Sequence, residues 1–298
     1  MSFYSSDRNF CLPEFNRLPP NELKPKIPQG IIPEISSLKP KKAVLFDVYG
    51  TLFISSAGDI STIEDGNGNL LRKVITDKLE IEANSLPVDL ESLLKEEILI
   101  FQENIKSEGI EFPEVEIRMI WLRMLERLGF DSVDSMILCE MVTMYECLAN
   151  PCYPMPGSKD LILKLVEDGY LVGIISNAQF YTQAMFKHFF GLWPEEMGIS
   201  KDLCYWSYEF LEGKPSCTKY EKAKKDLMAS YKVSPEEVLY VGNDMRNDIM
   251  PATKVGFQGV LFAGDSRSLR LRQKDASCAN LIPKATITEL NQIFDILY

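Results

Sequence analysis

Short apolar runs alternate with amphipathic segments over the second half of the chain. The runs that read as buried strands are "AVLF" (43–46), "YLVGIISNA" (170–178), "VLYVGND" (238–244) and "GVLFAG" (259–264). Helical spacing of apolar positions occurs in residues 158–169, 179–191 and 218–231, and "SPEE" (234–237) is a capping box. Strands that alternate with helices over short connections predict an α/β protein, with a Rossmann-like parallel sheet covered by helices on both faces.

The pattern is purely helical between residues 57 and 155. Amphipathic helices are expected near 88–106, 114–130 and 137–148, with Gly129 ending the second and Ser132 capping the third. We therefore expect an all-helical cap subdomain at 57–155, inserted into an α/β core of residues 41–56 and 156–298.

The first forty residues follow neither pattern. They contain prolines at 13, 19, 20, 25, 28, 33 and 40 and show little periodicity. Proline removes a backbone donor and interrupts helices and sheets, so residues 1–40 are expected to form an extended N-terminal arm without chemistry of its own.

Composition narrows the class of protein. The chain is 46% hydrophobic and 25% charged, as expected of a globular protein. Acidic residues outnumber basic residues 43 to 32, for a net charge of -11. This balance argues against nucleic acid or a membrane surface as the partner, yet it permits a small anionic substrate. No apolar run approaches the roughly 18 residues of a membrane helix.

The cysteine and histidine content bears on compartment and metal chemistry. Seven cysteines without a C-x-x-C pair favour reduced thiols, and hence a cytoplasmic protein. A single histidine, His188, argues against a zinc site. The sequence does not predict an oligomeric state.

Polar side chains end the predicted strands. Asp47 ends the first, Ser176 and Asn177 end the second, and Asn243 and Asp244 end the third, while Lys214 lies in the loop "EGKPS". In an open parallel sheet, ligands bind at the carboxyl ends of the strands. Four loops should therefore bring a carboxylate, a hydroxyl, an ammonium group and a second acidic cluster to one edge.

These loops resemble the four motifs of the haloacid dehalogenase superfamily. The motifs are "DVYGTL" (47–52), "ISN" (175–177), "GKP" (213–215) and "VGNDMRND" (241–248), and the resemblance extends from residue 43 to about 290. It implies a hydrolase whose helical cap, inserted after the first motif, closes over the site and sets specificity.

The resemblance also implies residue roles. Asp47 would be the nucleophile that forms an aspartyl-enzyme ester, and Lys214 would neutralise charge on Asp47 and on the transferring group. Thr51, Ser176 and the amide of Asn177 would donate hydrogen bonds to that group. Asp244 and Asp248, with the oxygen of Asn243, would help to hold a magnesium ion together with Asp47, and the carbonyl of Tyr49 would supply a further oxygen. Asp248 has an alternative role, in which it orients the loop amides without contacting metal.

Two motifs favour different reactions. Typical phosphatases of this family have a second aspartate two residues after the nucleophile, where this chain has Tyr49. The first motif thus resembles that of the 2-haloacid dehalogenases, whose halide leaving group needs no proton. The acidic fourth motif resembles the magnesium-dependent phosphatases. We rank a magnesium-dependent phosphatase of a small phosphorylated metabolite first, a metal-free dehalogenase-type hydrolase second, and a non-catalytic binding or regulatory protein third.

A cluster of arginines lies outside the motifs. Arg267, Arg270 and Arg272 fall within "SRSLRLRQK". Charged runs are usually solvated, so a solvent-exposed face is expected here, with a phosphate-binding patch as the alternative.

Overall fold

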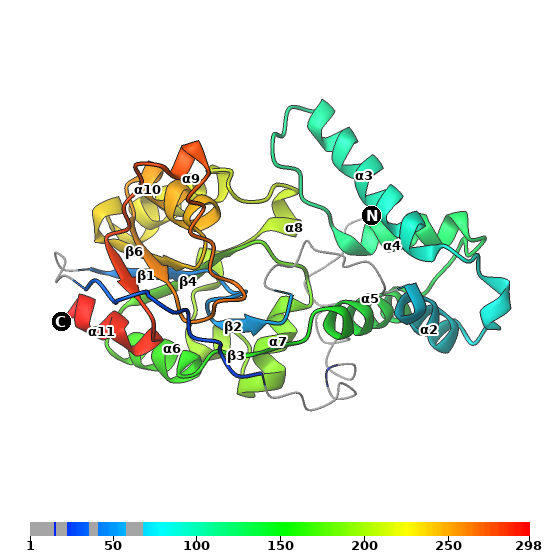
Figure 1. Ribbon diagram of the computed structural model, residues 1–298, viewed down its shortest axis with the longest axis horizontal. Coiled ribbons are helices and arrows are strands. Elements are labelled where there is room, and N and C mark those ends of the chain that lie inside the picture. Colours follow the sequence, from blue (N-terminus) through cyan, green and yellow to red (C-terminus); the bar gives the residue numbers. More distant parts are fainter. Residues whose placement is uncertain (1–14, 16–22, 36–40, 58–67) are drawn as a thin grey trace.

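A computed structural model describes residues 15, 23–35, 41–57 and 68–298 of the chain (Figure 1). The remainder of the predicted arm and residues 58–67 of the predicted cap lie outside the described residues. Six strands form one parallel sheet in the order β5-β4-β1-β6-β7-β8. The strands are β1 (Ala43–Phe46), β4 (Leu171–Ser176), β5 (Cys204–Trp206), β6 (Val238–Gly242), β7 (Gln258–Phe262) and β8 (Ala285–Ile287).

Helices cover both faces of this sheet, as predicted. One face carries α9 (Thr218–Asp226) and α10 (Met250–Val255), and the other carries α6 (Ser158–Glu167), α7 (Thr182–Phe190) and α11 (Ile293–Leu297) (Figure 1). The central strand β1 shows why both faces need a cover. Successive side chains point to opposite faces, and Val44 and Phe46 join one apolar cluster while Ala43 and Leu45 join the other. The α/β fold class is therefore confirmed.

A group of helices from the inserted segment lies beside the sheet rather than on either face (Figure 1). They are α2 (Gly68–Leu79), α3 (Leu90–Ser107), α4 (Ile117–Arg127) and α5 (Ser135–Ala149). At the two ends of this segment, β2 (Phe53–Ser55) and β3 (Cys152–Pro154) pair in antiparallel fashion. The cap boundaries at 57 and 155 stay a prediction. A further short α-helix is α8 (Ser207–Phe210), and two π-helical turns span Leu227–Tyr231 and Met245–Ile249.

The residues at the helix ends can be compared with the capping residues predicted from the sequence. Glu237 and Ser234 form the predicted capping box, and Gly129 follows α4 in the left-handed conformation, with φ of 89°. The predicted N-cap residue of α5 was wrong. Asp134, not Ser132, precedes the helix and accepts hydrogen bonds from the amides of Met136 and Ile137. A carboxylate at this position also interacts favourably with the positive end of the helix dipole.

Part of the predicted arm lies along the core. Residues 23–35 contain no helix, and Glu34 pairs with Thr286 of β8 in an antiparallel bridge. Backbone groups of Lys24 and Lys26 contact residues 265–267. Among the described helices, none is both long enough and apolar enough to cross a membrane.

Candidate active site

Asp47 directly follows β1 and is almost completely buried, at 6% exposure. Its Oδ1 accepts hydrogen bonds from Ser176 Oγ at 2.8 Å and from Lys214 Nζ at 2.6 Å. Ser176 ends β4, the strand next to β1, so the parallel register brings the hydroxyl to the carboxylate. Among the described residues Oδ2 has no hydrogen-bond partner, and Asp47 lines a cavity. One oxygen is therefore held in place while the other is available to a ligand.

Lys214 is shared between two carboxylates. Its Nζ lies 2.6 Å from Asp47 Oδ1 and 2.5 Å from Asp248 Oδ1. Tyr240 of β6 completes the cluster, because its hydroxyl lies 3.0 Å from Lys214 Nζ and 3.1 Å from Asp248 Oδ1. The Lys214 backbone N–H donates to Asn177 Oδ1. The loops of the second and third motifs are thus joined through the Lys214 backbone, while its ammonium group links the first motif to the fourth.

Burial and charge oppose each other in this cluster. Burial alone would lower the pKa of Lys214, but Asp248 and Asp47 outweigh it and raise that pKa. The pKa of Asp248 is raised overall. Burial is the largest cause, repulsion from Asp47 and Asp244 adds to it, and Lys214 lowers the pKa only in part. Lys214 is therefore fully charged at neutral pH, and the site has a fixed positive charge next to Asp47.

The fourth motif forms a tight turn around Asp244. Its Oδ1 accepts the amide hydrogens of Arg246 and Asn247, while its carboxylate forms an ion pair with Arg272, with Nη2 to Oδ2 at 2.5 Å. The Asp244 backbone N–H donates to Asp248 Oδ2. In this arrangement every carboxylate oxygen of Asp244 and Asp248 already accepts a hydrogen bond.

Asn243 links the first motif to a later loop. Its Oδ1 accepts from Thr51 Oγ1 at 3.1 Å, and its Nδ2 donates to the carbonyl of Ser268 at 2.7 Å. Between Asp47 and Thr51 the chain turns at Gly50, which has φ of 83°. A Cβ at Gly50 would lie only 2.5 Å from Ser268 Cβ, so only glycine allows this approach. Thr51 donates to Asn243 here, and its predicted hydrogen bond to the transferring group stays a prediction.

The predicted motif residues surround a small cavity of about 50 Å³. It is lined by Asp47, Tyr49, Asn177, Lys214, Asn243, Asp244, Asn247, Asp248, Ser268 and Arg270. Ser176 and Thr51 reach it only through Asp47 and Asn243. This volume suits a phosphoryl-sized group with an ion or a few waters, because a single water needs about 10–15 Å³.

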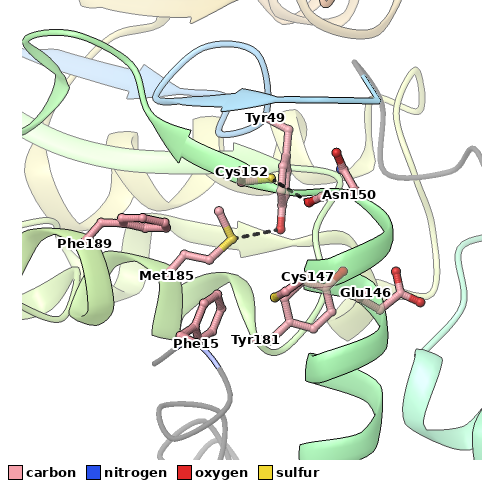
Figure 2. A pocket seen from close by; sticks show the side chains of 9 residues that line it. All are labelled: Phe15, Tyr49, Glu146, Cys147, Asn150, Cys152, Tyr181, Met185 and Phe189. Atoms are coloured by element: carbon pink, nitrogen blue, oxygen red, sulfur yellow. Dashed lines mark hydrogen bonds between the residues drawn. The ribbon is translucent and has the colours of Figure 1, made fainter. Parts of the chain in front are cut away.

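The Tyr49 hydroxyl lies elsewhere. It is 2.7 Å from Thr182 Oγ1 and donates to Met185 Sδ at 3.5 Å, both on α7. Figure 2 shows the ring pointing into a second pocket of about 20 Å³, between α5 and α7, with Glu146 and Tyr181 nearby. Burial raises the pKa of Tyr49 well above its usual value. The phenol is therefore neutral and bound to α7, and only the rest of Tyr49 borders the Asp47 cavity.

Oxygen donors in the cavity match the preference of a hard cation such as magnesium. Among the described residues, Asp47 Oδ2 has no hydrogen-bond partner, and Asn243 Oδ1 accepts a hydrogen bond only from Thr51. The Tyr49 carbonyl belongs to the same turn. No group of three Asp, Glu, His or Cys side chains suited to a metal occurs in the described part of the chain. The residues thus fit magnesium only if water and a substrate oxygen complete its coordination.

Three contributors were not predicted from the sequence. Tyr240 supports Lys214 and Asp248 from within β6, Arg272 pairs with Asp244, and Ser268 packs on Gly50. Tyr240 could have been found from the sequence, because it carries a hydroxyl and lies four residues before Asp244 on a strand that ends at the site. For Arg272 the arginine cluster was a signal, although it did not indicate the pairing with Asp244. Ser268 had none, because its approach to Gly50 depends on the fold of a distant loop.

Comparisons with known proteins agree with this architecture. The family described as haloacid dehalogenase-like hydrolase matches residues 41–256. The protein therefore belongs to that family of hydrolases.

Individual relatives are distant. A glyceraldehyde 3-phosphate phosphatase of Pyrococcus furiosus is 23% identical, over 86% of this chain and 92% of its own. The crystal structure of a 2-haloacid dehalogenase from Pseudomonas syringae pv. Tomato DC3000 aligns with a TM-score of 0.55 at 19% identity, covering 86% of this chain and 98% of its own. A HAD phosphatase from Thermococcus onnurineus aligns with a TM-score of 0.50 at 19% identity, covering 86% and 97%. These structures share the fold with the present chain.

Proposed function

We propose that this hydrolase is a magnesium-dependent phosphatase of small phosphorylated metabolites, with Asp47 as the nucleophile. The observation that carries the proposal is the asymmetric carboxylate of Asp47. Oδ1 is held by Ser176 and Lys214, and Oδ2 has no partner among the described residues of a cavity that suits a phosphoryl group. Distant relatives named as phosphatases support the same reaction.

The proposed reaction proceeds in two displacements at phosphorus. Asp47 Oδ2 attacks the phosphorus, the bond to the leaving oxygen breaks, and that oxygen takes a proton from water, which leaves hydroxide. A water molecule then adds to phosphorus and gives a proton to that hydroxide, and the bond to Asp47 breaks, which frees inorganic phosphate and restores the carboxylate. Lys214 stabilises the negative charge of the transferring group, and the Asn177 amide would donate a hydrogen bond to it.

Magnesium would be held by Asp47, Asn243 and the carbonyl of Tyr49, with water and a substrate oxygen. When bound, it offsets the repulsion between the phosphate and the acidic side chains. The hydrogen bonds already made by Asp244 and Asp248 favour a positioning role for both. All six described cysteines are free, which supports a reducing compartment such as the cytoplasm.

The test uses purified protein, a panel of phosphate esters and a set of 2-haloacids, each with magnesium or with a chelator. We expect phosphate release that requires magnesium and falls at least about 10³-fold in Asp47→Asn, which removes the nucleophile. Asp202→Asn, at an exposed position, is the matched control and should keep full activity. Phosphate release that persists in Asp47→Asn would contradict the assignment.

A second candidate is dehalogenase-type hydrolysis without metal. The observation in its favour is the Tyr49 hydroxyl, which is bound to α7 and so leaves position 49 without an acid for the leaving group. Halide leaves as a stable anion and needs no proton. Halide release from a 2-haloacid that is insensitive to chelator would favour this reaction. Tight binding of a ligand without turnover of either panel would favour a non-catalytic role.

A further inference from the structure

The loop that follows β7 returns to the Asp47 cavity. Arg270 pairs with Asp244 in a parallel bridge: its amide donates to the carbonyl of Asn243, and its carbonyl accepts from the amide of Met245. Two residues earlier, Ser268 packs against Gly50, and its carbonyl oxygen accepts a hydrogen bond from the Asn243 side chain. Residues 265–272, here called the return loop, therefore contribute Ser268 and Arg270 to the cavity wall.

The base of the return loop is firmly anchored. Asp265 has a fully buried side chain and accepts hydrogen bonds from the amides of Lys26 and Arg267 and from the Arg267 guanidinium. The Ser266 amide donates to the carbonyl of Lys26. Ser268 and Arg270 are thus held beside the cavity before any ligand arrives, which lowers the entropic cost of binding.

The three arginines of this region differ in their partners. Arg267 is paired with Asp265, and Arg272 with Asp244. Arg270 donates through Nη1 to the carbonyl oxygens of Arg267 and Leu269, while its Nε and Nη2 have no acceptor among the described residues. A half-buried guanidinium that pairs with no carboxylate of the described residues, in a protein of net charge -11, is a cation available to an external anion.

Ser268 in the same loop also has an unsatisfied hydrogen-bonding atom. Ser268 is completely buried, and its hydroxyl has no hydrogen-bond partner among the described residues. Leaving a buried hydroxyl unsatisfied costs free energy, so such a group in a cavity wall indicates a missing ligand atom. An unsatisfied hydroxyl, from Ser268, and a guanidinium with unused donors, from Arg270, therefore belong to residues that border the same cavity.

We propose that Ser268 and Arg270 form a subsite for a second anionic group of the substrate, so that the preferred substrates are small phosphorylated acids. The transferring phosphoryl group is already served by Lys214. Each carboxylate of the site also has a cationic partner other than Arg270, because Lys214 contacts both Asp47 and Asp248, and Arg272 pairs with Asp244. The positive charge of Arg270 remains for an acid group on the leaving alcohol. This inference rests on the proposed phosphatase function.

The experiment compares two substrates that share a three-carbon skeleton. 3-Phosphoglycerate carries a carboxylate where glyceraldehyde 3-phosphate carries an aldehyde. The kcat/KM for each is measured for the wild type, Arg270→Gln, Arg270→Lys and Ser268→Ala. Arg246→Gln is the matched control, because Arg246 lies on the neighbouring turn, pairs with Asp275 and does not line the cavity. Thermal unfolding verifies that each variant folds.

We expect Arg270→Gln to lower kcat/KM for 3-phosphoglycerate roughly 10- to 100-fold relative to glyceraldehyde 3-phosphate, as for a lost hydrogen bond to a charged group. Ser268→Ala should lower the same ratio about 3- to 10-fold, Arg270→Lys should recover part of it, and Arg246→Gln should leave it unchanged. A ratio that stays within about twofold of the wild type in Arg270→Gln overturns the subsite, as does an equal loss on both substrates.

A binding measurement separates this inference from the phosphatase proposal. Calorimetry of 3-phosphoglycerate on Asp47→Asn, with and without Arg270→Gln, needs no turnover. If the wild-type protein hydrolyses no phosphate ester, the phosphatase proposal is wrong, but the subsite is not thereby contradicted. The subsite would still be supported by weaker 3-phosphoglycerate binding in the double variant, and an unchanged Kd would overturn it.

Discussion

At the scale of single residues, Tyr49 occupies the position, two residues after Asp47, where typical phosphatases of this family have an acid. In a phosphatase that uses an acid two residues after the nucleophile, that acid is typically worth about 10²–10⁴-fold in rate. Here the phenol is neutral, buried and hydrogen-bonded to Thr182 and Met185. If the proposed reaction holds, water must protonate the leaving alcohol, and kcat within a series of phosphate esters should rise as the pKa of that alcohol falls.

Tyr49→Phe tests this position directly. We expect kcat to stay within about threefold of the wild type, because the hydroxyl is not at the Asp47 cavity. Stability should fall by about 1 kcal/mol, since Thr182 loses a buried hydrogen bond. Steady-state kinetics with an aryl phosphate and denaturant unfolding measure the two effects. A loss of 10²-fold or more in kcat, with normal stability, would instead place the phenol in the chemistry.

At the scale of secondary structure, the connection between α3 and α4 is fastened to two motif loops. Gln179 accepts from the Ile117 amide at 3.1 Å and donates to the Val115 carbonyl at 2.8 Å. Next to Lys214, the Gly213 amide donates to the Phe112 carbonyl. The inserted helices are thus tied to the residues that hold Asp47, so a displacement of this connection would disturb the site.

Gln179→Ala should loosen this attachment. It leaves a buried amide and a buried carbonyl without partners, which should cost about 2–3 kcal/mol of unfolding free energy. Faster hydrogen exchange at Ile117 and a higher KM should accompany the loss. Gln102→Ala, on the partly exposed side of α3, is the control and should change neither quantity. Unchanged exchange at Ile117 in Gln179→Ala would show that the attachment does not depend on this side chain.

Much of the sheet and its edge was predictable from local pattern. The four longest described strands were expected, and the carboxyl ends of parallel strands share one edge, so Asp47, Ser176 and Asn243 had to meet there. The three-residue strands β2, β5 and β8 are too short to show a period, and β2 pairs with β3 about a hundred residues away.

Other parts of the site depend on contacts that no local pattern encodes. The direction of Tyr49 is set by Thr182 on another helix, and the positions of Ser268 and Arg270 are set by the return loop pairing beside Asn243. The expectation of a solvated arginine face treated three side chains alike, whereas Arg267, Arg270 and Arg272 have different environments.

At the scale of the whole molecule, the interface between the inserted helices and the sheet domain contains an ionisable group. Glu146 of α5 borders the pocket that receives the Tyr49 hydroxyl (Figure 2). Burial raises the pKa of Glu146 to about 7, although a hydrogen bond from Tyr181 lowers it in part. The folded protein therefore favours the protonated carboxyl, and the charged form carries a penalty.

The interface should consequently weaken as pH rises. The contribution of Glu146 to stability is complete below its unfolded pKa of about 4.5 and is lost as pH rises through about 7. In Glu146→Gln this loss should disappear. The stability difference between pH 5 and pH 8 should shrink by about 1–2 kcal/mol, because the group keeps some solvent contact.

Denaturant unfolding at the two pH values measures this difference, and Glu126→Gln, at an exposed position on α4, is the control. Identical pH dependence in the wild type and in Glu146→Gln would mean that Glu146 stays ionised in the folded state.

The contacts of residues 23–35 have a practical consequence for shortened versions of the chain. Lys24 and Lys26 contact Asp265, Ser266 and Arg267 through main-chain atoms, so these contacts do not depend on the lysine side chains, although position 26 needs a backbone N–H and excludes proline. Removal of the residues before 36 would leave every side chain of the proposed site in the protein. It would remove the backbone contacts that hold Asp265, Ser266 and Arg267, so we expect the proposed subsite at Ser268 and Arg270 to lose selectivity before the protein loses stability.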